Sequence, residues 1–96
     1  MINTHESHTI EERRKRMKKR INQIRQEPAK IRIGKKGITE GILQEIEVLL
    51  KREQFIKIKC LKIVPTESTK AIAQNIANIT GCKILDIRGK TFILGK

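Results

Sequence analysis

The hydrophobic positions of this chain change period several times, and the clearest period is helical. Aliphatic residues recur at intervals of three and four between residues 38 and 50, which predicts a helix from Thr39 to about Arg52. A second helical period predicts a helix from about Glu67 to Thr80, with Gly81 following as its C-terminal cap. The aliphatic residues of these two stretches are Ile38, Ile42, Leu43, Ile46, Leu49, Leu50, Ile72, Ile76 and Ile79.

Alternation of apolar and polar residues predicts four strands around these helices. A short strand follows Pro28, and a longer one ends at Pro65. Two further strands flank Gly89-Lys90, a pair suited to a tight hairpin turn. The predicted strands are residues 29–33, Phe55–Val64, Lys83–Arg88 and Thr91–Leu94.

The N-terminal part of the chain predicts a basic helix with one narrow apolar stripe. Thr9 and Glu12 have the spacing of a capping box, and Pro28 stops the pattern after about Gln26. We expect residues 1–9 to form a polar tail and residues 10–96 a single domain, on which the helix docks through its stripe. A solvated, disordered arm is the alternative for so basic a segment. The stripe consists of Ile10, Met17, Ile21 and Ile24.

The predicted order of elements is αβαβαββ, which favours an α/β fold. We expect a single two-layer domain with a four-stranded mixed sheet and helices mainly on one face. Strand alternation places four basic side chains on the other face of the sheet, which we expect to be open. These are Lys30, Arg32, Lys57 and Lys59.

Charge narrows the class of partner. The 96 residues include 22 lysines and arginines against 10 acidic residues, so the formal charge is +12 and the sequence pI is about 10.3. This excess is typical of proteins that bind a polyanion, either nucleic acid or an anionic membrane. The sequence has no apolar run long enough to cross a bilayer and no hydrophobic stretch of the signal-peptide kind after Met1. We therefore expect a soluble, cytoplasmic monomer that binds nucleic acid and no membrane.

Gly34-Lys35-Lys36-Gly37, between the first predicted strand and the helix at Thr39, is a candidate phosphate site. The glycines allow a sharp turn and close approach of a ligand to the backbone. The following helix supplies unpaired N–H groups and the positive end of its dipole, and the two lysines add charge at the same place. In the alternative interpretation, glycine only serves the turn and lysine only serves solubility.

The candidate nucleic-acid-binding surface extends from this loop to the basic sheet face and the basic first helix. A run of basic side chains on a helix attracts a polyanion by charge alone. With two phenylalanines and no tyrosine or tryptophan, the chain is not expected to stack bases on an aromatic sheet. The candidate residues are Gly34, Lys35, Lys36, Gly37, Thr39, Lys30, Arg32, Lys57, Lys59, Arg13, Arg14, Arg16, Lys18, Lys19 and Arg20.

The sequence shows no catalytic or metal-binding motif, so we predict that the protein is not an enzyme and has no cofactor, metal or small-molecule substrate. Cys60 and Cys82 are too far apart for a Cys-x-x-Cys site, and we interpret both as small buried thiols. His5 and His8 lack a second pair of ligands. The glycine loop lacks the spacing and the final Gly-Lys-Ser/Thr of a nucleotide-hydrolysing P-loop.

Four segments of the chain share their residues and spacing with one known family. They are residues 34–43 (Gly-Lys-Lys-Gly-Ile-Thr-Glu-Gly-Ile-Leu), Leu50-Lys51-Arg52 ahead of Ile56-Lys57-Ile58-Lys59, the stretch from Ile72-Ala73 to Thr80-Gly81, and residues 89–94 (Gly-Lys-Thr-Phe-Ile-Leu). Together they resemble the CRM domain (chloroplast RNA splicing and ribosome maturation) in its single-domain, YhbY-like form. The resemblance extends from the basic first helix to Leu94.

The resemblance implies a compact RNA-binding fold similar to the C-terminal domain of translation initiation factor three, with the Gly-x-x-Gly loop in contact with RNA. It also implies binding of ribosomal RNA or of large-subunit precursors during ribosome assembly in prokaryotes, and intron splicing in plant organelles. The chain departs from the family pattern after its final strand, where Gly95-Lys96 stands in place of the usual aromatic residue.

The main alternative function is that of an Alba-like chromatin protein, which binds DNA or RNA. That class shares a βαβαββ fold, small size and a Gly-Lys-Lys loop. Alba-like chains usually have proline after the two lysines, where this chain has Gly37, and this difference favours RNA over duplex DNA. A protein–protein adaptor is also conceivable, but it would leave the charge of +12 without a role.

Overall fold

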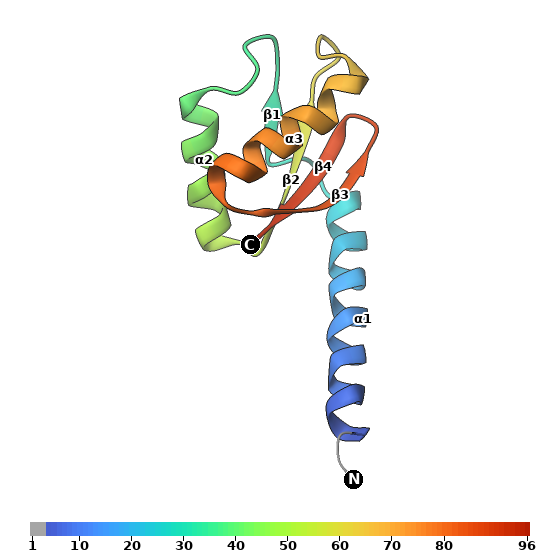
Figure 1. The fold of residues 1–96 in the computed structure, drawn as a ribbon. Helices are drawn as coiled ribbons and strands as arrows, with labels where there is room; N and C mark the ends of the chain where they lie inside the picture. Colours follow the sequence, from blue (N-terminus) through green and yellow to red (C-terminus); the bar gives the residue numbers. More distant parts are fainter. Residues whose placement is uncertain (1–3) are drawn as a thin grey trace.

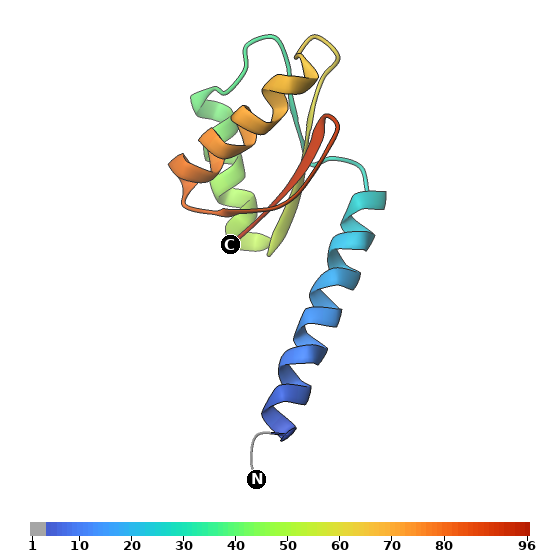
Figure 2. The same ribbon diagram turned by 45° about the vertical axis from the view of Figure 1, so that its right-hand side comes forward.

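A computed structural model describes the backbone of residues 4–96 and the side chains of residues 10–96. The elements follow in the predicted order αβαβαββ. Two helices lie on one side of the sheet, and the first helix leaves the other side as a rod (Figures 1 and 2). The helices are α1 (Thr4–Gln26), α2 (Glu40–Arg52) and α3 (Thr66–Thr80), and the strands are β1 (Ile31–Ile33), β2 (Phe55–Cys60), β3 (Lys83–Arg88) and β4 (Thr91–Gly95).

The four strands form one mixed sheet in the order β1-β2-β4-β3. β1 and β2 are parallel, and β4 pairs antiparallel with both β2 and β3. Gly89 turns the β3–β4 hairpin with a φ of 55°, at the position predicted from the sequence. The predicted fold class, a two-layer α/β domain with a four-stranded mixed sheet and helices mainly on one face, is confirmed.

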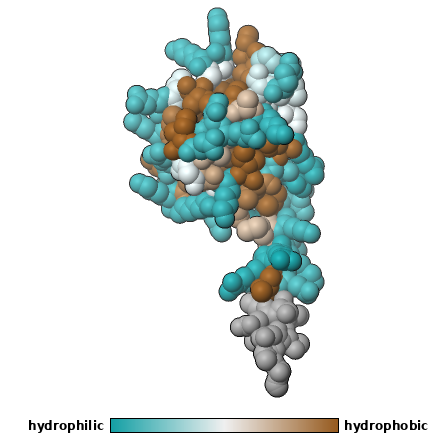
Figure 3. All heavy atoms as spheres, viewed as in Figure 1, coloured by the Kyte–Doolittle hydropathy of each residue, from teal (hydrophilic) through white to brown (hydrophobic). Residues whose placement is uncertain are grey.

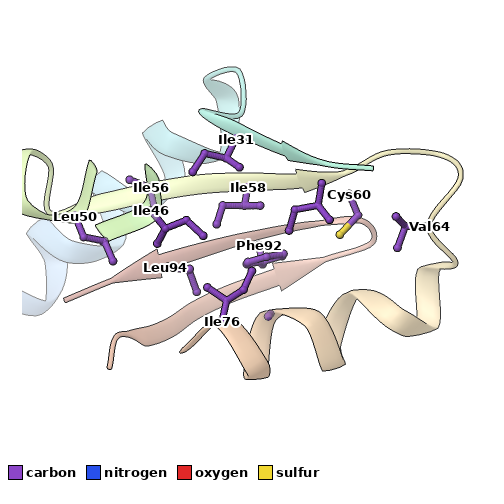
Figure 4. Packing of buried hydrophobic residues seen from close by; sticks show 12 residues of the cluster. Ile31, Ile46, Leu50, Ile56, Ile58, Cys60, Val64, Ile76, Phe92 and Leu94 are labelled. Carbon is purple, nitrogen blue, oxygen red and sulfur yellow. The ribbon is translucent and has the colours of Figure 1, made fainter. Parts of the chain in front are cut away.

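The core lies between the sheet and the helices α2 and α3. Ile58 of β2 and Phe92 of β4 are directly opposite each other in the strand register, and both are buried. Ile46 of α2 and Ile76 of α3 pack against the same cluster. Figure 4 shows Ile76 beside Phe92 and Leu94. Each fully buried side chain of this size contributes about 1.5–3 kcal/mol to folding, so this layer holds the two helices to the sheet.

The ends of the two core helices follow local capping rules. Thr39 is the N-cap of α2, and its Oγ1 accepts a hydrogen bond from the Ile42 N–H at 3.2 Å. Gly81 ends α3 with a φ of 71° and donates its N–H to the Ala77 carbonyl at 2.9 Å. The predicted boundaries of both helices therefore agree with the observed ones to within a residue.

The second strand is shorter than predicted. It ends at Cys60 because β1 ends at Ile33, directly opposite Cys60, and β4 pairs no further than Lys59. The chain then turns, and the Val64 N–H donates to the Leu61 carbonyl at 2.9 Å. The predicted strand Phe55–Val64 is confirmed as far as Cys60 and was wrong beyond it, since no neighbouring strand is available to satisfy the backbone of residues 62–64.

Helix α1 begins at Thr4, earlier than the capping box at Thr9 predicts. Residues 4–9 of the predicted polar tail are thus helical, and residues 1–3 lie outside the described part of the chain. Docking through the apolar stripe is confirmed only at its C-terminal end, where Ile24 is 4% exposed, while Ile10 is 50% exposed. The last turns of α1 contact β2 and β4. The remainder projects beyond the domain, so the molecule measures 56 × 23 × 21 Å.

Two polar contacts anchor the last turn of α1 to the sheet. Arg25 donates from Nε and Nη2 to the two carboxylate oxygens of Asp86 in β3, at 2.9 and 3.0 Å. Lys57 of β2 donates from Nζ to the carbonyls of Arg25 and Glu27, at 2.7 and 2.9 Å. These carbonyls lie at the negative end of the helix, which a lysine ammonium complements.

The Arg25 guanidinium holds the pKa of Asp86 below its usual value through this hydrogen bond. A carboxylate with a lowered pKa stabilises the folded state fully above its unfolded-state pKa, and this contribution is lost as the pH falls through the lower folded-state value. The contact between α1 and β3 is therefore complete at neutral pH and breaks only in acid.

Candidate nucleic-acid interface

The Gly-Lys-Lys-Gly loop, residues 34–37, forms a tight turn between β1 and α2. The Gly37 N–H donates to the Gly34 carbonyl at 2.9 Å. Gly37 has a φ of 66°, a left-handed conformation that favours glycine, and a Cβ added there would meet nothing within 4 Å. Lys35 and Lys36 are exposed at the tip, and neither forms an ion pair with another described residue. The loop thus presents open backbone and two free ammonium groups.

The N-terminus of α2 lies directly behind this loop. Its first backbone bond runs from the Leu43 N–H to the Thr39 carbonyl at 3.0 Å, and the Thr39 hydroxyl accepts from Ile42. Helix geometry leaves the N–H groups of Glu40 and Gly41 without a helical acceptor, at the positive end of the dipole. Because the Thr39 oxygen already caps its own helix, only its hydroxyl hydrogen is left to donate to a ligand. This combination of donors suits a phosphate group.

A row of cations crosses the second face of the sheet, at the end nearest the loop. Arg32 of β1 lies opposite Lys59 of β2, and Thr91 of β4 continues the row to Arg88 of β3. We call the exposed residues Arg32, Lys59 and Arg88 the basic row. Since neighbouring strands lie about 4.8 Å apart, the backbone positions of the three residues fall within about 15 Å. Arg88 Nε also lies 3.8 Å from Asp86 Oδ2. Like charges on opposed positions destabilise a sheet, and a bound anion would relieve that repulsion.

Sequence reasoning missed Arg88 because of a β-bulge. The β3–β4 register shifts between Ile84 and Asp86, so one extra residue lies in β3 at this point. Simple alternation from the core residue Ile84 would direct Arg88 into the core layer, whereas the bulge turns it to the second face. No turn residue marks the bulge in the sequence, so only the pairing in the structure could reveal this residue.

Two of the four predicted sheet cations have other partners, so the second face is not as open as predicted. Lys57 binds the end of α1, and the last turns of that helix cover the adjacent part of the sheet. Lys30 lies 3.6 Å from the Glu53 carboxylate. Only Arg32 and Lys59 remain exposed and without an ion pair to the described residues. The candidate surface on the sheet is therefore its loop-proximal end.

The basic residues of α1 lie apart from the loop, on the part of the helix that projects from the domain (Figure 1). Arg13, Arg16 and Arg20 share one side of the helix and line a shallow groove of about 430 Å³ together with Phe55 of β2. Figure 3 shows hydrophilic side chains along the described part of α1 and around the rim of the domain. The other predicted bases, also exposed, are Arg14, Lys18 and Lys19.

Other chemistry is limited in the described part of the chain. No group of three His, Cys, Asp or Glu residues with described side chains could hold a metal ion, and His5 and His8 lie outside that set. Cys60 is buried, as predicted, and burial raises the pKa of its thiol, whereas Cys82 is only half-buried. Among the described helices, none has the length and apolar character that crossing a membrane requires.

A family and a solved structure match this chain. The family model of the CRS1/YhbY (CRM) domain matches residues 10–96. The fold is similar to the solution structure of SAV1595 from Staphylococcus aureus, which is described as a hypothetical protein and a candidate RNA-binding protein. The two chains are 20% identical with a TM-score of 0.66, over 78% of this chain and 77% of that one. At this identity the structural likeness establishes the fold.

Proposed function

Because the chain belongs to the CRS1/YhbY (CRM) domain family, we propose that it binds RNA mainly through the Gly-Lys-Lys-Gly loop and the basic row. The observation that carries this proposal is the meeting of open glycine backbone, a helix N-terminus and two free lysines at one turn. Such groups hold phosphate oxygens and read no base. The protein then recognises RNA by its backbone and shape and catalyses no reaction.

Helix α1 provides a second contact in this proposal. The exposed basic residues of α1 and the loop lie toward different ends of a molecule 56 Å long. One RNA that reaches both must therefore be structured over a comparable length. Double-stranded RNA suits such a span, since single RNA-binding domains can follow about 16 base pairs of it.

The partner within this proposal is ribosomal RNA, bound free or in precursors of the large ribosomal subunit, by a cytoplasmic monomer that assists ribosome assembly. The resemblance to YhbY-like proteins supports this choice. Crosslinking in cells, with positions resolved on the RNA, tests it, and crosslinks confined to other RNAs would refute it. Duplex DNA at matched salt is the competitor that separates RNA binding from general polyanion binding.

Changing Lys35 and Lys36 together to Ala is expected to weaken binding of all structured RNAs alike. Lysines at a loop tip contribute charge with little geometric selectivity. The slope of log affinity against log salt should fall by about one to two units, at about 0.7–0.9 for each lost phosphate contact. Fluorescence anisotropy across a salt series measures this slope.

The matched control removes the same charge elsewhere. Lys51, in the last turn of α2, and Lys96 line one shallow pocket with Gly81, at the end of α2 that is far from the loop. Their double Ala variant should keep nearly the parental slope. An equal loss of slope in both double variants would show that only net charge matters, and an unchanged slope in the loop variant would reduce its lysines to a solubility role.

A further inference from the structure

We propose that the turn between β2 and α3 holds an unpaired RNA base next to the phosphate bound by the Gly-Lys-Lys-Gly loop. The turn presents two aliphatic side chains, Leu61 and Ile63, which we call the apolar patch. This inference rests on the proposed function and deepens it, because it specifies structured RNA with unpaired nucleotides next to its duplex as the preferred ligand.

The apolar patch is unusually exposed. Ile63 is 64% exposed, the most of any large hydrophobic side chain described, and Leu61 is 39% exposed. Figure 3 shows hydrophobic atoms reaching the surface at the upper end of the domain, where this turn lies in Figure 1. Exposed apolar side chains gathered at one point mark binding surfaces more often than scattered single ones do.

The apolar patch adjoins the loop directly through Leu61. The Leu61 N–H donates to the carbonyl of Ile33, the residue before Gly34, at 2.8 Å. A Cβ built on Gly34 would lie 3.3 Å from Leu61 Cδ1, so the glycine gives this side chain its place against the loop. Lys62 is exposed between the two patch residues. Apolar surface and positive charge therefore alternate around one point.

Lys90 fixes the shape of the turn. Its Nζ donates to the carbonyls of Leu61, Lys62 and Val64 at 3.4, 2.9 and 2.5 Å, and its own carbonyl accepts from the Cys60 N–H at 2.7 Å. An ammonium has three hydrogens to donate, and all three are directed into the turn. Lys90 thus serves the turn rather than a phosphate. A turn that is already ordered binds a ligand with little further loss of entropy.

The size and surroundings of the apolar patch fit a nucleobase better than a protein partner. Two side chains cover the face of about one base, whereas a stable protein interface buries about 1,200 Å² or more. The nearby lysines can hold the phosphates on either side of such a base. Paired bases keep their faces stacked inside the duplex, and only unpaired bases can place a face on a protein surface.

The experiment compares Ile63→Ser with the parent on two probes, a stem–loop RNA and the blunt duplex made from its stem. Affinity for the stem–loop should fall at least about fivefold, because the apolar contact is lost. Affinity for the duplex and the salt slope on both probes should not change, since no charge is altered. Ile63→Leu, which keeps the apolar contact, should restore stem–loop binding. Ile79→Ser is the matched control, because Ile79 is 59% exposed at the other end of α3.

The outcomes separate this inference from the proposed function. Parental stem–loop binding by Ile63→Ser, in a series where the Lys35 and Lys36 double variant binds more weakly, would overturn the base contact and leave the loop contact standing. An equal loss on the duplex, or an equal loss with Ile79→Ser, would also overturn it. If the double variant of Lys35 and Lys36 binds both probes at parental strength, the proposed RNA contact of the loop is refuted. The base contact, which depends on a phosphate bound by the loop, is then refuted with it.

Discussion

Changing Gly37 to Asp is expected to weaken RNA binding at least about tenfold, or 1.4 kcal/mol, in a protein that stays folded. The site has room, since a Cβ there meets nothing within 4 Å. Asp is among the residues that best tolerate a positive φ, and its charge complements the N-terminus of α2. The melting temperature should remain within a few degrees of the parent, for a change under about 1 kcal/mol. The same carboxylate repels the incoming phosphate.

The control for this change is Gly37→Asn, which has nearly the same shape and no charge. It should bind RNA close to parental strength, because the strain of a positive φ is similar and the repulsion is absent. If both variants lose stability and binding together, the loop is a structural turn. If the folded Gly37→Asp protein binds as the parent does, residues 34–37 do not contact RNA. Circular dichroism measures the melting temperature and fluorescence anisotropy measures the RNA affinity of the same sample.

Removing six positive charges from α1 is expected to produce the second large loss of affinity without loss of fold. The variant replaces six exposed lysines and arginines by Gln, which preserves helix propensity. These basic side chains lie around the helix, so about half of them can contact one RNA. The slope of log affinity against log salt should therefore fall by about two to three units, and affinity should fall at least about tenfold. The six residues are Arg13, Arg14, Arg16, Lys18, Lys19 and Arg20.

Deleting residues 1–26 should lower the melting temperature as well, which the Gln variant should not do. Ile24 is 4% exposed, and its burial on the sheet contributes about 1.5–3 kcal/mol. The deletion should therefore reduce the melting temperature by at least about 6 °C. If the deleted protein melts as the parent does, α1 does not dock in solution. A Gln variant with parental affinity would mean that α1 serves no RNA contact.

Much of the fold could be predicted from the sequence, because its signals are local. The periods of α2 and α3, the cap at Gly81 and the turn at Gly89 each depend on a few neighbouring residues. The end of β2 could not be predicted, since it depends on where β1 and β4 stop pairing. Ile63 and Val64 are apolar enough to continue a strand, yet no partner strand lies beside residues 62–64.

In the candidate site, too, features that depend on local sequence could be predicted and features that depend on tertiary contacts could not. The Gly-Lys-Lys-Gly loop could be found as a motif, whereas Lys57 and Lys90 bind residues distant in sequence and Arg88 depends on the register of its hairpin. Lys57 lies on the predicted face but binds the end of α1, and Arg88 joins the basic row only through a bulge. A charge count treats these lysines and arginines alike. Only their hydrogen-bond partners distinguish an anchor from a surface available to RNA.

The most direct test of the loop as the centre of the RNA contact is amide chemical-shift mapping of the parental protein with the stem–loop RNA. We expect the largest shifts at residues 34–41, with further shifts at the basic row and at Ile63. Residues on the outer surface of α2 and α3, such as Val48 and Ile79, should not shift. Shifts concentrated on that outer surface, with residues 34–37 unchanged, would contradict the account.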